Sequence, residues 1–129
     1  MTRAYILETA RECARLLKHA SYREHAYQAV LGHLLKKAGY NVELEAGVVY
    51  RLPDGFVFGH GRLDMLVTDA ENNEHFILEL KANVRPNIQS HLGQLSRYLE
   101  HRPEEATGIL IYFNGWDSDV HHYFLEPRK

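Results

Sequence analysis

A mixed α/β domain is predicted by the order of hydrophobic patterns along the chain. Apolar residues recur with helical spacing in the first 39 residues and again after Pro86, whereas the segment between them is rich in β-branched and aromatic residues. No repeat and no linker rich in Pro, Gly or Ser interrupts the sequence. With 129 residues, of which 45% are apolar, the chain can bury one core, so we expect a single domain over residues 1–129.

The first 39 residues are predicted to be helical, with a break near residue 20. One apolar stripe follows the spacing i, i+4, i+7, i+11, and a second stripe continues after the break. Ser21 followed by Glu24 matches a capping box, which would restart the helix there, and Gly39 ends the helical region. The two stripes are Ile6, Ala10, Cys13 and Leu17, and then Ala26, Val30 and Leu34.

Short strands and one further helix account for the rest of the chain. Apolar residues with helical spacing between Ile88 and Leu99 predict the helix, and Pro103 ends it. Clusters of Gly, Pro, Asn and Asp separate the strands. Strands are expected near 41–51, 56–58, 62–69, 75–82, 107–113 and 121–125, with turns at Pro53-Asp54-Gly55, Gly59-His60-Gly61 and Asn72-Asn73.

Composition excludes several classes of protein. No apolar stretch approaches the roughly 20 residues of a membrane span, and the amino terminus lacks the apolar core of a signal peptide, so a soluble, intracellular protein is expected. Cys13 is the single cysteine, which excludes an internal disulfide and a multi-cysteine metal site. Residues 1–39 carry seven Lys/Arg against three Glu, and residues 40–129 carry eight against fourteen Asp/Glu. This asymmetry is compatible with a nucleic-acid-binding face or with an ordinary solvated helix surface.

The hairpin that joins strands 62–69 and 75–82 carries the most informative pattern. With its turn centred on residues 70–73, residues whose numbers sum to 143 lie opposite one another, so Asp64 faces Glu79. In this register one face of the hairpin is entirely apolar and must belong to the core. Its facing pairs are Leu63 with Leu80, Met65 with Leu78, and Val67 with Phe76.

Two carboxylates directly opposite each other destabilise a sheet unless a positive charge holds them together. Mg²⁺ suits this position, because it binds a few carboxylate oxygens and keeps several waters. Lys81 lies two residues beyond Glu79 and therefore on the same face, where it is able to orient a water or stabilise developing charge. The alternative is a surface cluster in which Arg62 and Lys81 neutralise Asp64 and Glu79 as cross-strand ion pairs.

At these residues the chain resembles the PD-(D/E)xK nuclease superfamily, and within it the small GxxExxY-type and RecB-like members. The resemblance implies a restriction-endonuclease-like core, with a central mixed sheet flanked by helices, and hydrolysis of phosphodiester bonds with Mg²⁺ or Mn²⁺. It also implies a metal site formed by Glu24, Asp64, Glu79 and Leu80. The motifs read Arg62-Leu63-Asp64, then Glu79-Leu80-Lys81, and Ser21-Tyr22-Arg23-Glu24-His25-Ala26-Tyr27 with Ser in place of the first Gly.

Four further residues have both a functional and a structural interpretation. By resemblance, Glu24 completes the metal site from a helix, whereas a capping box would explain the same residue by local structure alone. Gln94 and Tyr98 resemble the Q-x-x-x-Y element that follows E-x-K in RecB-like branches, and His91 lies one turn earlier on the same face. A polar helix surface is the alternative for these three side chains.

The sequence therefore predicts a metal-dependent endo- or exonuclease with catalytic residues Glu24, Asp64, Glu79, Lys81 and Gln94. Nucleic acid is the expected partner, with DNA favoured over RNA, and a homodimer would suit the cutting of both strands of a duplex. The alternative function is a catalytically inactive module that keeps the nuclease fold and binds nucleic acid or a protein partner.

Overall fold

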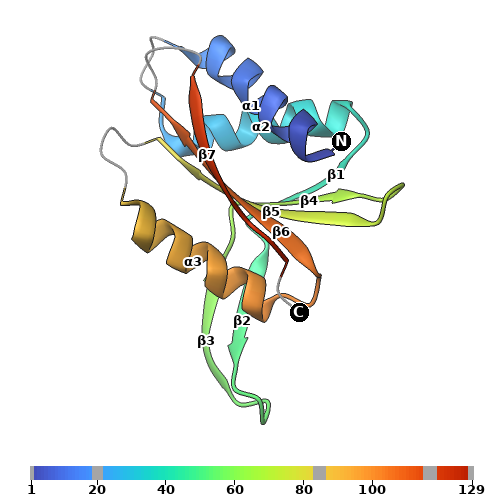
Figure 1. Cartoon of the computed structure of the whole chain (residues 1–129), viewed down its shortest axis with the longest axis vertical. Coiled ribbons are helices and arrows are strands. Elements are labelled where there is room, and N and C mark those ends of the chain that lie inside the picture. Colours follow the sequence, from blue (N-terminus) through green and yellow to red (C-terminus); the bar gives the residue numbers. More distant parts are fainter. Residues whose placement is uncertain (1, 19–21, 83–86, 115–118, 128–129) are drawn as a thin grey trace.

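The computed structural model describes residues 2–18, 22–82, 87–114 and 119–127. A five-stranded sheet has helices on both faces, and a two-stranded sheet projects from one end of it (Figure 1). This arrangement confirms the predicted mixed α/β fold. The elements are α1 (Thr2–Leu17), α2 (Glu24–Lys37), β1 (Asn41–Leu44), β2 (Gly47–Arg51), β3 (Val57–Arg62), β4 (Met65–Asp69), β5 (Glu74–Lys81), α3 (Ile88–His101), β6 (Ala106–Phe113) and β7 (Val120–Leu125).

The main sheet has the strand order β1-β4-β5-β6-β7. Its neighbouring strands are antiparallel except for β5 and β6, which run parallel. Parallel neighbours need a crossover connection, and α3 lies in the chain between these two strands. All eight residues of β6 are buried, because helices cover both faces of the sheet at its centre.

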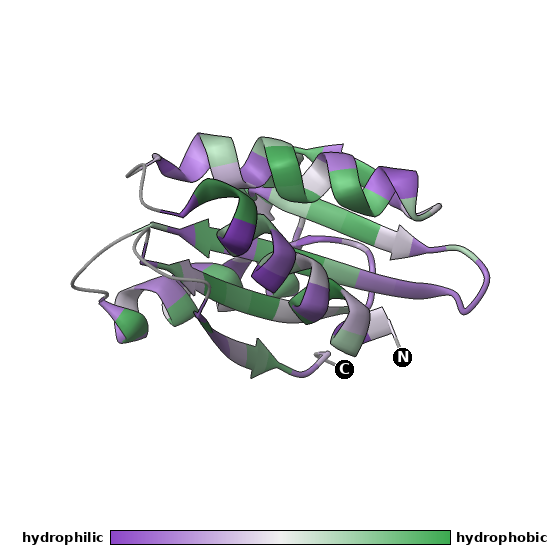
Figure 2. Cartoon of the chain, turned by 90° about the horizontal axis from the view of Figure 1, so that it is seen from above, coloured by the Kyte–Doolittle hydropathy of each residue, from purple (hydrophilic) through white to green (hydrophobic). Residues whose placement is uncertain are grey.

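Each face of the sheet has its own core. In β5, the side chains of Phe76, Leu78 and Leu80 belong to the core shared with α1 and α2, whereas Ile77 belongs to the core shared with α3. Glu79 alternates with Leu78 and Leu80, so its side chain lies on the α3 face. In Figure 2 the helices carry stripes of polar and apolar residues, and the central strands are predominantly apolar.

The predicted register of the β4–β5 hairpin is confirmed from Met65–Leu78 to Asp69–Glu74. The prediction for Leu63 was wrong. Its side chain lies in the α3 core rather than opposite Leu80, and its N–H donates to the carbonyl of Ala46. The reason is that the ladder ends at Met65, and the two residues before it carry the chain from one sheet to the other.

The single strand predicted over 41–51 is two strands in different sheets. Leu44 pairs with Met65 in the main sheet, and Gly47 pairs with Arg62 in the small one. The change of direction takes place at Glu45, whose φ of 54° lies in the left-handed region. Likewise, the strand predicted over 62–69 is divided between β3 and β4.

The predicted turn at Gly59-His60-Gly61 was wrong, because these residues lie within β3. The turn of this hairpin is at Pro53-Asp54-Gly55 as predicted, where Gly55 has a φ of 95°. The glycines of β3 are required by close packing. A Cβ at Gly61 would overlap the hydroxyl of Tyr50 and lie 3.1 Å from the ring of Tyr98.

The helices agree with the periodic pattern in all but one stripe. The core of α2 contains Tyr27, Leu31 and Leu35, one residue later than the predicted stripe of Ala26, Val30 and Leu34. Ser21 of the predicted capping box lies outside the described residues, and Arg23 caps α2 without a side-chain hydrogen bond. None of the described helices combines the length and the apolar character that a membrane crossing requires.

Candidate active site

Asp64 and Glu79 are joined by hydrogen bonds through the main chain. The N–H of Asp64 donates to Glu79 Oε1 at 3.0 Å, and the N–H of Leu80 donates to Asp64 Oδ2 at 2.7 Å. Asp64 lies in the short connection between β3 and β4, one residue before the ladder begins. The two carboxylates are therefore held beside each other at the end of the hairpin, on its α3 side.

Burial of this pair raises the pKa of both carboxyl groups. Glu79 is 2% exposed, and burial followed by the charge of Asp64 raises its pKa to about 8. The pKa of Asp64 is also raised, mainly by burial, although the N–H of Leu80 and the charge of Lys81 act in the opposite direction. A divalent cation bound beside these two acids would lower both pKa values and favour the ionised carboxylates.

Lys81 forms an ion pair with Glu79, whereas Arg62 is paired with Glu45. Lys81 Nζ is 3.9 Å from Glu79 Oε2, with the lysine side chain 17% exposed. Arg62 instead forms a 3.6 Å ion pair with Glu45 and keeps most of its side chain in solvent. The alternative of two surface ion pairs across the hairpin is thus wrong for Arg62, and one lysine cannot neutralise two carboxylates.

Helix α2 brings two polar side chains to the main chain beside the two carboxylates. Gln28 is buried, and its Nε2 donates to the carbonyl oxygen of Asp64 at 3.1 Å. One turn earlier, Glu24 Oε1 accepts a long hydrogen bond of 3.5 Å from the N–H of Ala82. The sequence analysis missed Gln28, although its position four residues after Glu24 on an otherwise apolar face was a usable signal.

The packing of α2 explains why Glu24 faces the sheet. Tyr27 is buried, and its ring stacks on Phe113 with a centroid distance of 4.3 Å. The sulfur of Cys13 donates to the carbonyl of Tyr27 at 3.6 Å, which ties α1 to the same turn. With Tyr27 fixed against the sheet, Gln28 reaches the main chain of Asp64, and Glu24 reaches that of Ala82, from the first turns of the helix.

Helix α3 covers the opposite side of the pair. Burial raises the pKa of Tyr98 to about 12, and the charges of Glu79 and Asp64 add to this effect, whereas a hydrogen bond from the Gln94 side chain lowers it. His91 Nδ1 is 2.7 Å from the Tyr112 hydroxyl.

The charges of the site also act on His91. Burial and then Lys81 lower the pKa of the imidazole, and Glu24 raises it. Tyr98 is buried, and Gln94 and His91 are half-buried, so none of these three candidates lies on an open helix surface.

The oxygen atoms at this site suit a hard divalent cation. Three carboxylates lie within electrostatic range of one another, and Leu80 has only its main-chain carbonyl to offer as a ligand. In the described part of the chain, however, no three acidic, His or Cys side chains converge as a preformed cage. Glu24, Asp64 and Glu79 each accept a hydrogen bond from a main-chain N–H.

Comparison with known proteins identifies the family. A family model described as the PD-(D/E)XK nuclease superfamily matches residues 4–122. The chain belongs to this superfamily. The five-stranded mixed sheet flanked by helices is the restriction-endonuclease-like core expected of a PD-(D/E)XK protein, and membership of the superfamily supports a nuclease-type function.

The solved structures that resemble the chain include the following two. The crystal structure of SSO0001 has 25% sequence identity and a TM-score of 0.51, and the match covers 81% of this chain and 56% of that one. The chain thus spans just over half the length of SSO0001. The cryo-EM structure of a DrdV–DNA complex has 13% identity and a TM-score of 0.46, covering 92% of this chain and 12% of that one. No curated protein matches the chain.

Proposed function

We propose that this PD-(D/E)XK protein is a divalent-metal-dependent nuclease that hydrolyses phosphodiester bonds of nucleic acid with Mg²⁺ or Mn²⁺. The observation that carries the proposal is the hydrogen-bonded pair of half-buried Asp64 and buried Glu79, with Lys81 beside Glu79, at the motif that gives the superfamily its name. The neighbouring acids have raised pKa values, and a bound divalent cation would stabilise their ionised forms. A preference for DNA over RNA follows from the family resemblance alone.

In this proposal one group of residues binds the metal ion, and another acts on the water and the phosphate. Asp64, Glu79, Glu24 and the carbonyl of Leu80 supply oxygen ligands, and the N–H groups of Asp64 and Leu80 hold the first two carboxylates in fixed orientations. When bound, a divalent ion lowers the pKa of the attacking water and stabilises negative charge on the phosphate.

Lys81 and Gln28 have separate roles beside the ligands. The ammonium group of Lys81 lies next to Glu79 with limited access to solvent, where it orients the water or stabilises charge on the phosphate oxygens. Gln28 fixes the main chain at Asp64 through its hydrogen bond to the carbonyl oxygen, so it acts as a positioning residue.

The test is cleavage of labelled single-stranded DNA, duplex DNA and RNA in Mg²⁺, Mn²⁺ or EDTA. We expect cleavage with either ion, none in EDTA, and faster cleavage of DNA than of RNA. Asp64→Asn should abolish cleavage and weaken Mg²⁺ binding measured by calorimetry. Glu71→Gln, an exposed change in the turn at the far end of the same hairpin, should leave both unchanged. Equal rates for wild type and Asp64→Asn would overturn the proposal, because the cleavage would then arise from another source.

A further inference from the structure

The β2–β3 hairpin exposes large apolar side chains at its outer end. It projects away from the main sheet (Figure 1), and Phe56 and Phe58 are 63% and 56% exposed. Leu52 and Val57 in the same hairpin are also exposed. Neighbouring exposed apolar side chains on a small domain indicate an interaction surface.

A β-bulge sets the position of Phe58. Tyr50 pairs with Gly59 and Arg51 pairs with Val57, so Phe58 is the extra residue of β3. Its ring lies 6.0 Å from the ring of Tyr50 and 5.9 Å from that of His101, measured between centroids. One side of the Phe58 ring is therefore supported while more than half of the side chain remains open to solvent, which suits a stacking platform.

The inner end of this hairpin leads to the candidate active site. The Tyr50 hydroxyl reaches Gly61, against which the ring of Tyr98 also packs. The strand itself makes the same connection, because β3 ends only two residues before Asp64.

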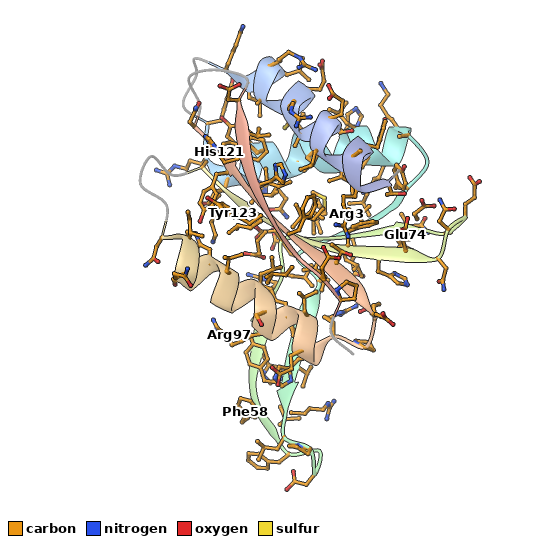
Figure 3. The ribbon with its side chains drawn as sticks, viewed as in Figure 1. Arg3, Phe58, Glu74, Arg97, His121 and Tyr123 are labelled. Carbon is orange, nitrogen blue, oxygen red and sulfur yellow. The ribbon has the colours of Figure 1, made fainter. Side chains whose placement is uncertain are left out.

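The charges around the hairpin favour an anionic partner. Residues 47–62 carry two arginines against one Asp, whereas residues 40–129 as a whole carry six more acidic than basic residues. Arg51 is exposed on β2, and Arg97 is exposed on α3, the helix beside the hairpin in Figure 3. Arg62 stays largely in solvent in spite of its ion pair with Glu45. Guanidinium groups beside exposed rings fit a phosphate backbone with accessible bases.

We propose that the β2–β3 hairpin binds an unpaired nucleic-acid strand, with bases stacked on Phe58 and Phe56 and the backbone near Arg51, and leads that strand to Asp64 and Glu79. The inference rests on the proposed nuclease function and specifies its substrate as single-stranded, because bases within a duplex do not expose their faces for stacking. The competing occupant of the hairpin is a second copy of the chain.

The test is fluorescence anisotropy with a short labelled single-stranded DNA in EDTA, so that no metal-dependent cleavage interferes. Phe58→Ala should weaken binding about tenfold, the scale of one lost base stack, and Phe58→Tyr should restore it. Leu16→Ala, an equally exposed apolar change on α1, should have no effect. An oligonucleotide without bases should lose the stacks on both Phe58 and Phe56 and bind the wild type about a hundredfold more weakly, and Phe58→Ala should then cause no further loss.

The outcomes separate this inference from the proposed function. Hairpin-dependent binding by a wild-type protein that does not cut in Mg²⁺ would support the inference and remove the nuclease function. Cutting by the wild type, with Phe58→Ala binding equally well, would overturn the inference alone. Absence of binding by the wild type would also overturn it. A dimer in sedimentation that Phe58→Ala dissociates, without a change in oligonucleotide affinity, would assign the hairpin to self-association instead.

Discussion

Replacing Glu79 with Gln should change how stability depends on pH in metal-free buffer. Glutamine keeps the size of the side chain and an oxygen to accept from the N–H of Asp64, but it removes the buried charge. Burial and then Asp64 raise the pKa of Glu79 from 4.5 to about 8 in the folded protein. A raised pKa contributes stability that is fully present below pH 4.5 and is lost as pH rises through about 8.

The size of the effect follows from the shift. Between the two pKa values the folded state holds one more proton than the unfolded state, so the free energy of unfolding falls by up to about 1.4 kcal/mol for each pH unit. From pH 5 to pH 7 the wild type should lose at most roughly 3 kcal/mol through Glu79. Glu79→Gln lacks this group and should therefore become more stable than the wild type at pH 7, while the two remain similar at pH 5.

Urea unfolding followed by circular dichroism at pH 5, 6 and 7 in EDTA measures this difference. Glu71→Gln removes an exposed carboxylate from the turn of the same hairpin and serves as the control. Its free energy of unfolding should depend on pH in the same way as that of the wild type. Parallel curves for wild type and Glu79→Gln would refute the reasoning, because they would mean that Glu79 ionises in the folded protein as easily as in the unfolded chain.

Three other substitutions test the surrounding residues. Lys81→Ala should reduce cleavage at least a hundredfold while the melting temperature changes little, since it removes charge stabilisation at the reaction. Single-turnover rates and thermal melts measure the two effects. A lower melting temperature that accounts for the lost activity would show a role in folding alone. Glu24→Gln should weaken the activation of cleavage by Mg²⁺ but cost no more than about 1 kcal/mol of stability. The cleavage rate is measured at increasing Mg²⁺ concentration. A curve identical to that of the wild type would mean that the role of Glu24 is structural only. Gln28→Leu should lower the free energy of unfolding by about 1 to 3 kcal/mol, because it leaves the carbonyl of Asp64 without its donor. The same variant should bind Mg²⁺ more weakly in calorimetry, and unchanged Mg²⁺ affinity would contradict its positioning role.

Local patterns in the sequence were sufficient to predict the hairpin that carries the candidate site. An alternating strand has two faces, and a shift of one residue would move every apolar side chain to the wrong face, so the register from Met65–Leu78 onward was determined by the sequence. That register brought Asp64 close to Glu79. The helical stripes of α1 and α3 followed in the same way from a period of 3.6 residues.

The conformation of Leu63 and Asp64 was decided by tertiary structure. Extending the ladder to these residues placed Leu63 on the wrong face, because the chain leaves one sheet and enters another between Arg62 and Met65. The glycines of β3 were wrongly predicted to form a turn for a related reason. Gly61 is required by the rings of Tyr50 and Tyr98, which a local pattern does not connect to it.

The surroundings of the carboxylates likewise depend on residues distant in the sequence. Gln28 and Asp64 are 36 positions apart, and His91 and Tyr112 are 21 apart. Periodicity assigns a side chain to a face of its own helix or strand, but it does not say which residue of another element lies opposite. Those pairings arise only when α2 and α3 pack on the two faces of the sheet, so the sequence determined the hairpin and its acidic pair, and the packing of the helices determined what surrounds them.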